Sequence, residues 1–223
     1  IDLERFRFDP EGRARLRAEW GVADDEILVG TVGRRVREKG LAEYAAAASA
    51  LSDHARFVWV GPEDESEPVT RLPTSVDLIP EQVDMPAVYS AFDVFVLASY
   101  REGFSRAAME AAACARPMVL SDIRGCREIG SHGEHLLLVP AHSPQKLAEA
   151  VSLLIDDEVL REQLAAAAQT RARVEFDQRD LAQISLSIYR MLCSQNRDEK
   201  RSLLAGIGPR DGVRSARRSA PAS

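Results

Sequence analysis

The chain has 223 residues, 45% of them hydrophobic, and a formal net charge of −6. This length and apolar content are enough for one substantial core, and no stretch of 18 apolar residues is present that could span a membrane. An acidic chain with 6% aromatic residues is a poor binder of nucleic acid, so an anionic ligand would need a local pocket.

Hydrophobic periodicity, glycines and prolines predict alternating helices and strands up to residue 139. After a linker at 1–9, the expected elements are a helix at 10–20, a strand at 27–32, a helix at 41–51, strands at 56–61 and 76–79, a helix at 85–92, a strand at 94–98, a helix at 105–114, and strands at 117–120 and 135–139. Segments 62–73 and 121–128 are expected to be loops. Three helices, at 144–155, 159–176 and 179–193, follow without further strands.

Six short strands that alternate with helices indicate an α/β fold. We expect a Rossmann-like, mainly parallel six-stranded sheet with helices on both faces and further helices appended at the C-terminal end. Such sheets bind ligands at the carboxyl ends of their strands. The loops 33–40, 99–105 and 121–128 each follow a predicted strand, so they should line one edge of the sheet.

The segment from Ser99 to Glu110 carries the strongest functional signal. It follows the apolar strand 94–98, contains Gly103, and leads into an alanine-rich helix that Ser105 can cap. Free backbone N–H groups at a helix N-terminus, aided by the helix dipole, favour an anion. The segment therefore predicts a seat for a phosphate or diphosphate.

Two carboxylates, Glu102 and Glu110, lie on either side of this seat. If the helix begins near Ser105, Glu110 lies roughly 7–8 Å along its axis. A carboxylate can accept two hydroxyl groups, so this pair suits a nucleotide-sugar, which has sugar hydroxyls on both sides of a diphosphate. Alternatively, Glu102 is an ordinary loop acid and Glu110 an exposed helix residue. The alanines around Glu110 argue against that, since an unpaired charge there would be unfavourable.

A basic loop predicts a second contact to the anion. Arg34 and Lys39 follow the first strand in a glycine-bounded loop, and a guanidinium with an ammonium would complement helix N–H groups around a phosphate. A solvated basic turn is the alternative reading of this loop.

The sequence gives little support for a metal site, a cofactor or disulfide bonds. His132 and His135 are three residues apart, but no cysteine or carboxylate pattern completes a set of metal ligands, so neither a metal nor a cofactor is expected. Three widely spaced cysteines, Cys114, Cys126 and Cys193, indicate a reducing cytosol without disulfides. The chain begins without Met or a secretory signal, which suggests a fragment or a processed start.

With these residues in place, the chain resembles the C-terminal, donor-binding half of a group 1 (family 4) retaining glycosyltransferase of the two-domain GT-B type. The resemblance runs over about the first 195 residues. It rests on Asp2-Leu3-Glu4-Arg5-Phe6, on Gly33-Arg34 with Glu38-Lys39-Gly40, on Glu102-Gly103-Phe104 with Glu110, on Pro117-Met118-Val119, and on Asp122, Gly125 and Glu128. One departure is Gly133-Glu134, where the family usually has an Asn-Gly pair.

The resemblance implies roles for particular residues. The catalytic set would be Arg34 and Lys39 at the donor diphosphate and Glu102 at the donor sugar, with Glu110 on the ribose hydroxyls. Further donor contacts would come from Gly33, Pro80, Gln82, Val83, Gly103, Phe104, Ser105 and Arg106. It also implies transfer with retention at the anomeric carbon and without a metal ion. The run Tyr100–Arg106 is similar to bacterial transferases that build surface polysaccharides from UDP-sugars, often on lipid-linked acceptors.

The resemblance divides the chain into four parts. These are an interdomain connection with a short helix at 1–22, the donor-binding domain at 23–176, a helix at 177–195 that would pack toward a missing N-terminal acceptor domain, and a disordered basic tail at 196–223. We expect the chain to bind donor but not to transfer sugar by itself. The apolar face of helix 179–193 would be partly exposed, which leaves dimerisation open. The full-length enzyme is expected to be cytoplasmic, with a peripheral position at the inner membrane face as one option.

Two other hypotheses remain at this point. One is a binding module that senses a nucleotide-sugar without chemistry, and the other is a related nucleotide-sugar epimerase. Activity that appears once an N-terminal domain is added would distinguish the enzyme from the sensor.

Overall fold

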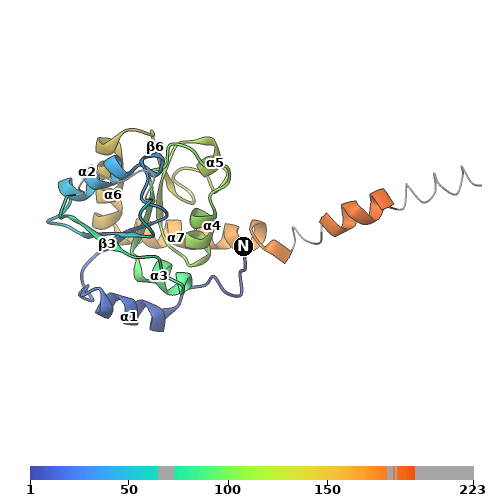
Figure 1. The fold of residues 1–223 in the computed structure, drawn as a ribbon, viewed down its shortest axis with the longest axis horizontal. Coiled ribbons are helices and arrows are strands. Elements are labelled where there is room, and N and C mark those ends of the chain that lie inside the picture. The colour runs from blue at the N-terminus through green and yellow to red at the C-terminus, as the bar shows by residue number, and fades with distance from the viewer. Residues whose placement is uncertain (65–72, 180–182, 184, 194–223) are drawn as a thin grey trace, which may run out of the picture. The chain divides into compact units, whose positions relative to one another are not determined.

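The structure is a computed structural model that describes residues 1–64, 73–179, 183 and 185–193. The chain forms two compact units, 1–178 and 179–223. The first unit contains the whole sheet and the helices around it (Figure 1).

The sheet of the first unit has six parallel strands. They are Leu28–Val32 (β1), Arg56–Val60 (β2), Val76–Ile79 (β3), Val94–Leu97 (β4), Met118–Ser121 (β5) and Leu137–Val139 (β6). Their order is β3-β2-β1-β4-β5-β6, and every neighbouring pair is parallel. The chain moves outward from β1 to β3 and then returns to β4 beside β1, so the order reverses between β1 and β4. Ligands of such sheets bind at this switch point. The predicted Rossmann-like sheet is confirmed.

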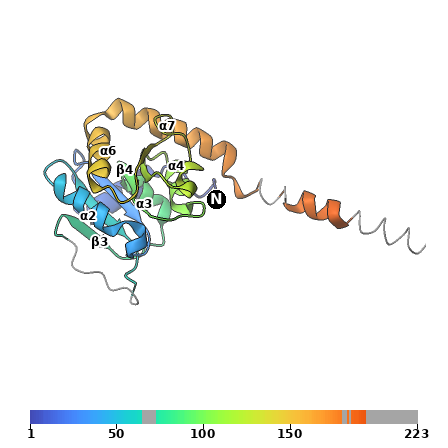
Figure 2. The same cartoon turned by 90° about the horizontal axis from the view of Figure 1, so that it is seen from above.

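Helices cover both faces of the sheet (Figures 1 and 2). Their bounds are Pro10–Glu19 (α1), Leu41–Ala50 (α2), Met85–Ala91 (α3), Arg106–Ala113 (α4), Pro144–Asp156 (α6) and Glu158–Glu175 (α7). Side chains alternate along the strands, so Val94 and Val96 join a core with α2 and α6, whereas Phe95 and Leu97 join a core with α1, α3 and α4. α7 contributes to both cores. The site edge is therefore held by two separate apolar layers.

Two short helices differ from the sequence-based prediction. Segment 121–128 was expected to be a loop, but Arg124–Arg127 forms a short helix (α5), and Arg37–Lys39 forms a single 3₁₀ turn (η1) in the basic loop. Neither is long enough to show a periodic apolar pattern, which is why the sequence did not reveal them. η1 lies in the loop after β1 and α5 in the loop after β5, so both are at the carboxyl edge.

The start of the first unit lies beside its end. The backbone N–H of Gln178 donates to the carbonyl of Ile1 at 2.9 Å. Phe6, in the predicted linker, is buried in the core with α3 and α4. Residues 1–9 are therefore packed against the body of the domain.

In the second unit, residues 185–193 are helical, as predicted, and carry Leu186, Ile188 and Leu192. Leu181 and Ile184 of the predicted apolar stripe, residues 65–72 of the predicted surface loop, and the predicted disordered tail lie outside the described residues. The domain boundaries and the dimerisation stay predictions. Among the described residues, no helix combines the length and the apolar character needed to cross a membrane.

Candidate functional site

The three predicted loops meet at the carboxyl edge through close backbone contacts. Gly40 has a φ of +71°, and a Cβ at this position would overlap the carbonyl group of Ala98 at the end of β4. A Cβ on Gly125 would lie 2.5 Å from the carbonyl oxygen of Glu102 and 2.6 Å from that of Gly103. Both approaches require glycine. They bring the loop after β1 and the start of α5 against the β4–α4 loop.

Lys39 and Glu102 come together at the centre of this edge. The Nζ of Lys39 lies 2.7 Å from Oε1 of Glu102, with the side chains 28% and 13% exposed. A second bond joins the same two loops: the backbone N–H of Tyr100 donates to the carbonyl of Glu38 at 2.9 Å. The carboxylate fixes the position of the ammonium group, which keeps two further N–H donors for an anion.

The start of α4 presents unpaired backbone donors. Ser105 caps the helix, as predicted, because its side chain accepts the N–H of Ala108 at 3.3 Å. The N–H groups of residues 103–107 have no hydrogen-bond partner within the described parts of the chain. Unpaired N–H groups at and just before a helix N-terminus are suited to binding a phosphate.

Glu110 is buried inside α4 and holds two partners. The hydroxyl of Tyr89 donates to Oε2 at 2.9 Å, and Nε of Arg106 donates to Oε1 at 3.1 Å. Burial, with Glu110 next to it, raises the pKa of the Tyr89 hydroxyl well above its usual range, so Tyr89 is the donor in this bond. The burial that the alanine-rich context of Glu110 predicted is observed.

Arg34 does not join Lys39 in contacting Glu102. Its Nη1 lies 2.6 Å from Oδ2 of Asp64, and its side chain is 66% exposed. Gly33, with a φ of +146°, turns its carbonyl toward Nε1 of Trp59, 2.9 Å away. The side chain of Arg34 is therefore exposed to solvent at the sheet edge, while the backbone at Gly33 is held by Trp59.

The predicted base-binding loop is held by the N-terminal segment. Nη2 of Arg5 donates to the carbonyl of Val83 at 3.2 Å, and Nε2 of Gln82 donates to that of Pro80 at 3.3 Å. The side chain of Val83 is almost wholly exposed. The loop 80–83 thus presents the apolar side chain of Val83 and a backbone turn at the surface.

Phe104 contacts the end of α7. Its ring lies edge-on to that of Phe176, with ring centroids 5.6 Å apart, and remains about half exposed. This contact fixes the turn that leads into α4.

Two site residues were missed from the sequence, and a third, Ser99, was noted only as the start of segment 99–110. Tyr89 partners Glu110, and Asp64 partners Arg34. Ser99, two residues after β4, has a buried hydroxyl without a hydrogen-bond partner among the described residues. The position of Ser99 directly after a strand was a usable signal. Tyr89 and Asp64 come from other elements, and no local pattern marks them.

No group of three or more His, Cys, Asp or Glu side chains suited to a metal ion occurs in the described part of the chain. Cys114 and Cys126 are buried free thiols, and burial raises the pKa of each to about 12. They are therefore not reactive thiolates at neutral pH. Whether the reaction needs a metal ion stays a prediction.

Comparison with known families identifies this arrangement. The sequence model of the family described as "Glycosyl transferases group 1" matches residues 26–157, which is more than half of the chain. The chain belongs to the group 1 glycosyl transferases. This confirms the family that the sequence resembled, and the matched region includes both carboxylates, the basic loop and the start of α4.

Relatives and solved structures agree with this assignment. The N,N'-diacetylbacillosaminyl-diphospho-undecaprenol alpha-1,3-N-acetylgalactosaminyltransferase of Campylobacter jejuni is 34% identical over 170 residues, which are 74% of this chain and 45% of that protein. The putative teichuronic acid biosynthesis glycosyltransferase TuaC of Bacillus subtilis is 31% identical over 180 residues, 79% of this chain and 45% of TuaC. Anabaena HepE, solved in complex with UDP-glucose, superposes with a TM-score of 0.78 at 25% identity and covers 87% of this chain and 56% of HepE. The chain thus spans about half the length of the relatives that it matches.

Proposed function

We propose that this chain is the donor-binding half of a retaining glycosyltransferase that moves a hexose from a UDP-sugar to a glycan or lipid-linked acceptor. The observation that carries the proposal is the run of N–H groups at 103–107 that have no partner among the described residues. In the sequence, the run lies between Glu102, with its partner Lys39, and the buried Glu110. This set offers positive groups for a diphosphate and carboxylates for hydroxyl groups beyond it.

Each part of the donor then has a partner. The diphosphate would accept hydrogen bonds from the backbone at 103–107, with the ammonium of Lys39 and the guanidinium of Arg34 as countercharges. Glu102 would accept hydroxyls of the hexose, and Glu110 those of the ribose. The uracil would lie against the loop 80–83. Arg34 would leave Asp64 to reach the phosphate, which its exposure allows.

In the proposed reaction, the bond between the anomeric carbon and the diphosphate oxygen breaks while the acceptor hydroxyl oxygen bonds to the same face of the sugar. Negative charge gathers on the departing diphosphate as its bond to the anomeric carbon breaks, and the oxygen released by that cleavage takes the proton of the acceptor hydroxyl. Fixed cations and N–H groups stabilise that charge without reorganising. We infer that Lys39, Arg34 and the α4 N-terminus supply this stabilisation in a reaction without a metal ion. Transferase activity that a chelator abolishes would refute this part.

The acceptor and the partner domain are inferred from the relatives. The Campylobacter relative is named for transfer to a diphospho-undecaprenol carrier, and HepE was solved with UDP-glucose. Since the chain spans about half of these proteins, we propose that an N-terminal domain binds the acceptor and that the chain alone binds donor without transferring it. A lipid-linked acceptor would place the full enzyme at the cytoplasmic membrane face.

Calorimetric titration of the chain with UDP, GDP and ADP, and with the corresponding glucose conjugates, tests the proposal. We expect UDP and UDP-glucose to bind. Glu110→Ala should weaken both about tenfold, because both contain the ribose, whereas Glu102→Ala should weaken only UDP-glucose. Equal losses for both ligands in both variants would refute the assigned roles. Absence of transfer after an N-terminal domain is joined would favour a binding module instead.

A further inference from the structure

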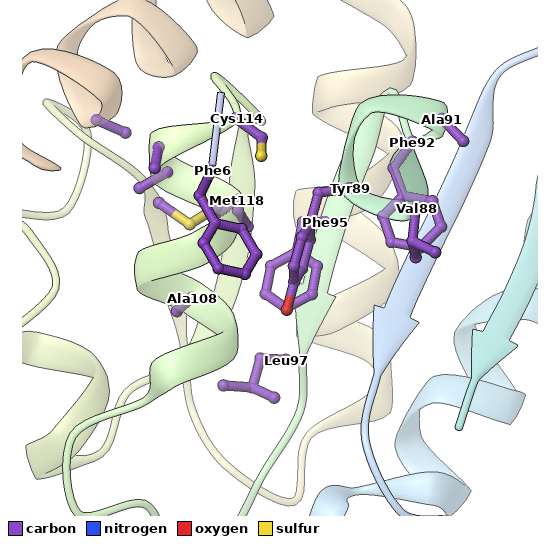
Figure 3. Close-up of a cluster of buried hydrophobic side chains, with 14 of the residues drawn as sticks. Phe6, Val88, Tyr89, Ala91, Phe92, Phe95, Leu97, Ala108, Cys114 and Met118 are labelled. Atoms are coloured by element: carbon purple, nitrogen blue, oxygen red, sulfur yellow. The ribbon is translucent and has the colours of Figure 1, made fainter. Parts of the chain in front are cut away.

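The ring of Tyr89 is fixed on all sides. Tyr89 is fully buried, and its ring makes edge contacts with Phe6 at 6.3 Å, Phe95 at 5.8 Å and Phe92 at 6.4 Å between centroids. Figure 3 shows the ring beside Phe6 and Phe95, with its hydroxyl oxygen at the end nearer Leu97, in the direction of the carboxyl end of β4. The hydroxyl is thus a donor whose position cannot vary with a side-chain rotation.

Glu110 is buried on α4, and two hydrogen bonds hold its carboxylate. One partner, Arg106, is 74% exposed and can swing into solvent when a ligand arrives. The other partner, Tyr89, stays. Oε2 keeps a second lone pair, and Oε1 becomes available when Arg106 leaves.

We propose that Tyr89 is a positioning residue for the nucleotide, whose hydroxyl holds the Glu110 carboxylate in the orientation that accepts the two ribose hydroxyls. The inference rests on the proposed function, because it takes Glu110 to be the ribose-binding group. Its new content is that selectivity for the ribose depends on a residue of α3 that does not touch the ligand. Phe6, from the N-terminal segment, supports the same ring.

The test compares UDP with 2′,3′-dideoxy-UDP, which lacks both ribose hydroxyls, by titration calorimetry on the full chain. The wild type should prefer UDP, and Glu110→Ala should lose the preference. Tyr89→Phe removes only the positioning hydroxyl, so we expect UDP affinity to fall about tenfold while dideoxy-UDP binding hardly changes. We do not expect a change in pH to restore the affinity of the Tyr89→Phe variant for UDP.

Tyr44→Phe is the matched control. Tyr44 is also buried, and its hydroxyl donates to the carbonyls of Val29 and Val58, on the α2 and α6 side of the sheet. The variant loses a buried hydroxyl of the same kind, far from Glu110 in the fold, and should keep the full preference for UDP.

The outcomes separate the inference from the function on which it rests. If Glu110→Ala loses the preference but Tyr89→Phe keeps it, or if Tyr44→Phe loses it equally, the positioning role is refuted while the proposed function stands. If the wild type binds no UDP, both are refuted. Tyr89→Phe could fail to fold because the buried carboxylate of Glu110 loses the hydrogen bond from Tyr89. The double variant Tyr89→Phe with Glu110→Ala removes that carboxylate. The double variant should bind UDP as tightly as Glu110→Ala alone, and an additional tenfold loss would overturn the inference.

Discussion

Gly125 sets how closely α5 approaches the loop that carries Glu102, and replacing it with alanine tests how tightly the site is built. The added Cβ would lie 2.5 Å from the carbonyl oxygen of Glu102, whereas ordinary contact begins at 3.4 Å. One backbone segment must therefore move by about 0.9 Å. Neither neighbour is a flexible side chain, so the strain cannot be relieved by a rotation.

The expected magnitude follows from that displacement. Overpacking of this kind costs about 1–3 kcal/mol in the free energy of unfolding. At about 3 °C per kcal/mol for a domain of this size, Gly125→Ala should melt about 3–9 °C below the wild type. The same shift moves Glu102 and the N–H groups that follow it. If that shift costs about one hydrogen bond to the donor, the affinity for UDP-glucose should fall about tenfold.

Thermal melting and calorimetry with UDP-glucose measure both effects. Gly103→Ala provides the contrast, because no heavy atom lies within 4 Å of a Cβ added there. Its melting temperature should stay within about 2 °C of the wild type. If Gly125→Ala melts like Gly103→Ala and binds UDP-glucose as tightly as the wild type, the loops are not in the close contact that we describe.

Two further predictions concern ion pairs at the same edge. A double-mutant cycle with Lys39→Met and Glu102→Gln should give a coupling of about 1–2 kcal/mol in the free energy of unfolding, since the pair is more buried than ordinary surface pairs, and a value near zero would contradict it. A hydrogen bond from Arg127 lowers the pKa of Asp122 below its ordinary value of 3.8. The stabilisation is therefore present above that value and lost as the pH falls through the lower folded-state pKa. The melting difference between wild type and Asp122→Asn should be seen at neutral pH and shrink as the pH falls below 3.8. A difference that does not change with pH would contradict this assignment.

The parts of the fold that local pattern determines were predictable. All six strands and the cap of α4 at Ser105 follow from apolar runs, turn residues and capping chemistry, which act over a few neighbouring residues. Burial of Glu110 also followed from its sequence, because its alanine neighbours leave few exposed polar positions on α4.

The residue pairs of the site were harder to predict from the sequence. Tyr89 and Glu110 are 21 residues apart on different helices, and their hydrogen bond depends on how α3 and α4 pack. Asp64, in the loop after β2, meets Arg34, in the loop after β1, and this contact likewise depends on tertiary packing. α5 was missed because four residues around Gly125 show no helical period. Such features arise from tertiary packing, which a single sequence does not encode locally.

The hydrogen bond between Gln178 and Ile1 has a mechanical consequence. Any polypeptide joined ahead of Ile1 and any joined behind Gln178 would be attached to this body at a common pivot. The movement of a domain attached there would be passed to the rim of the sheet near residues 1 and 178, and not directly to the ion pair of Lys39 and Glu102.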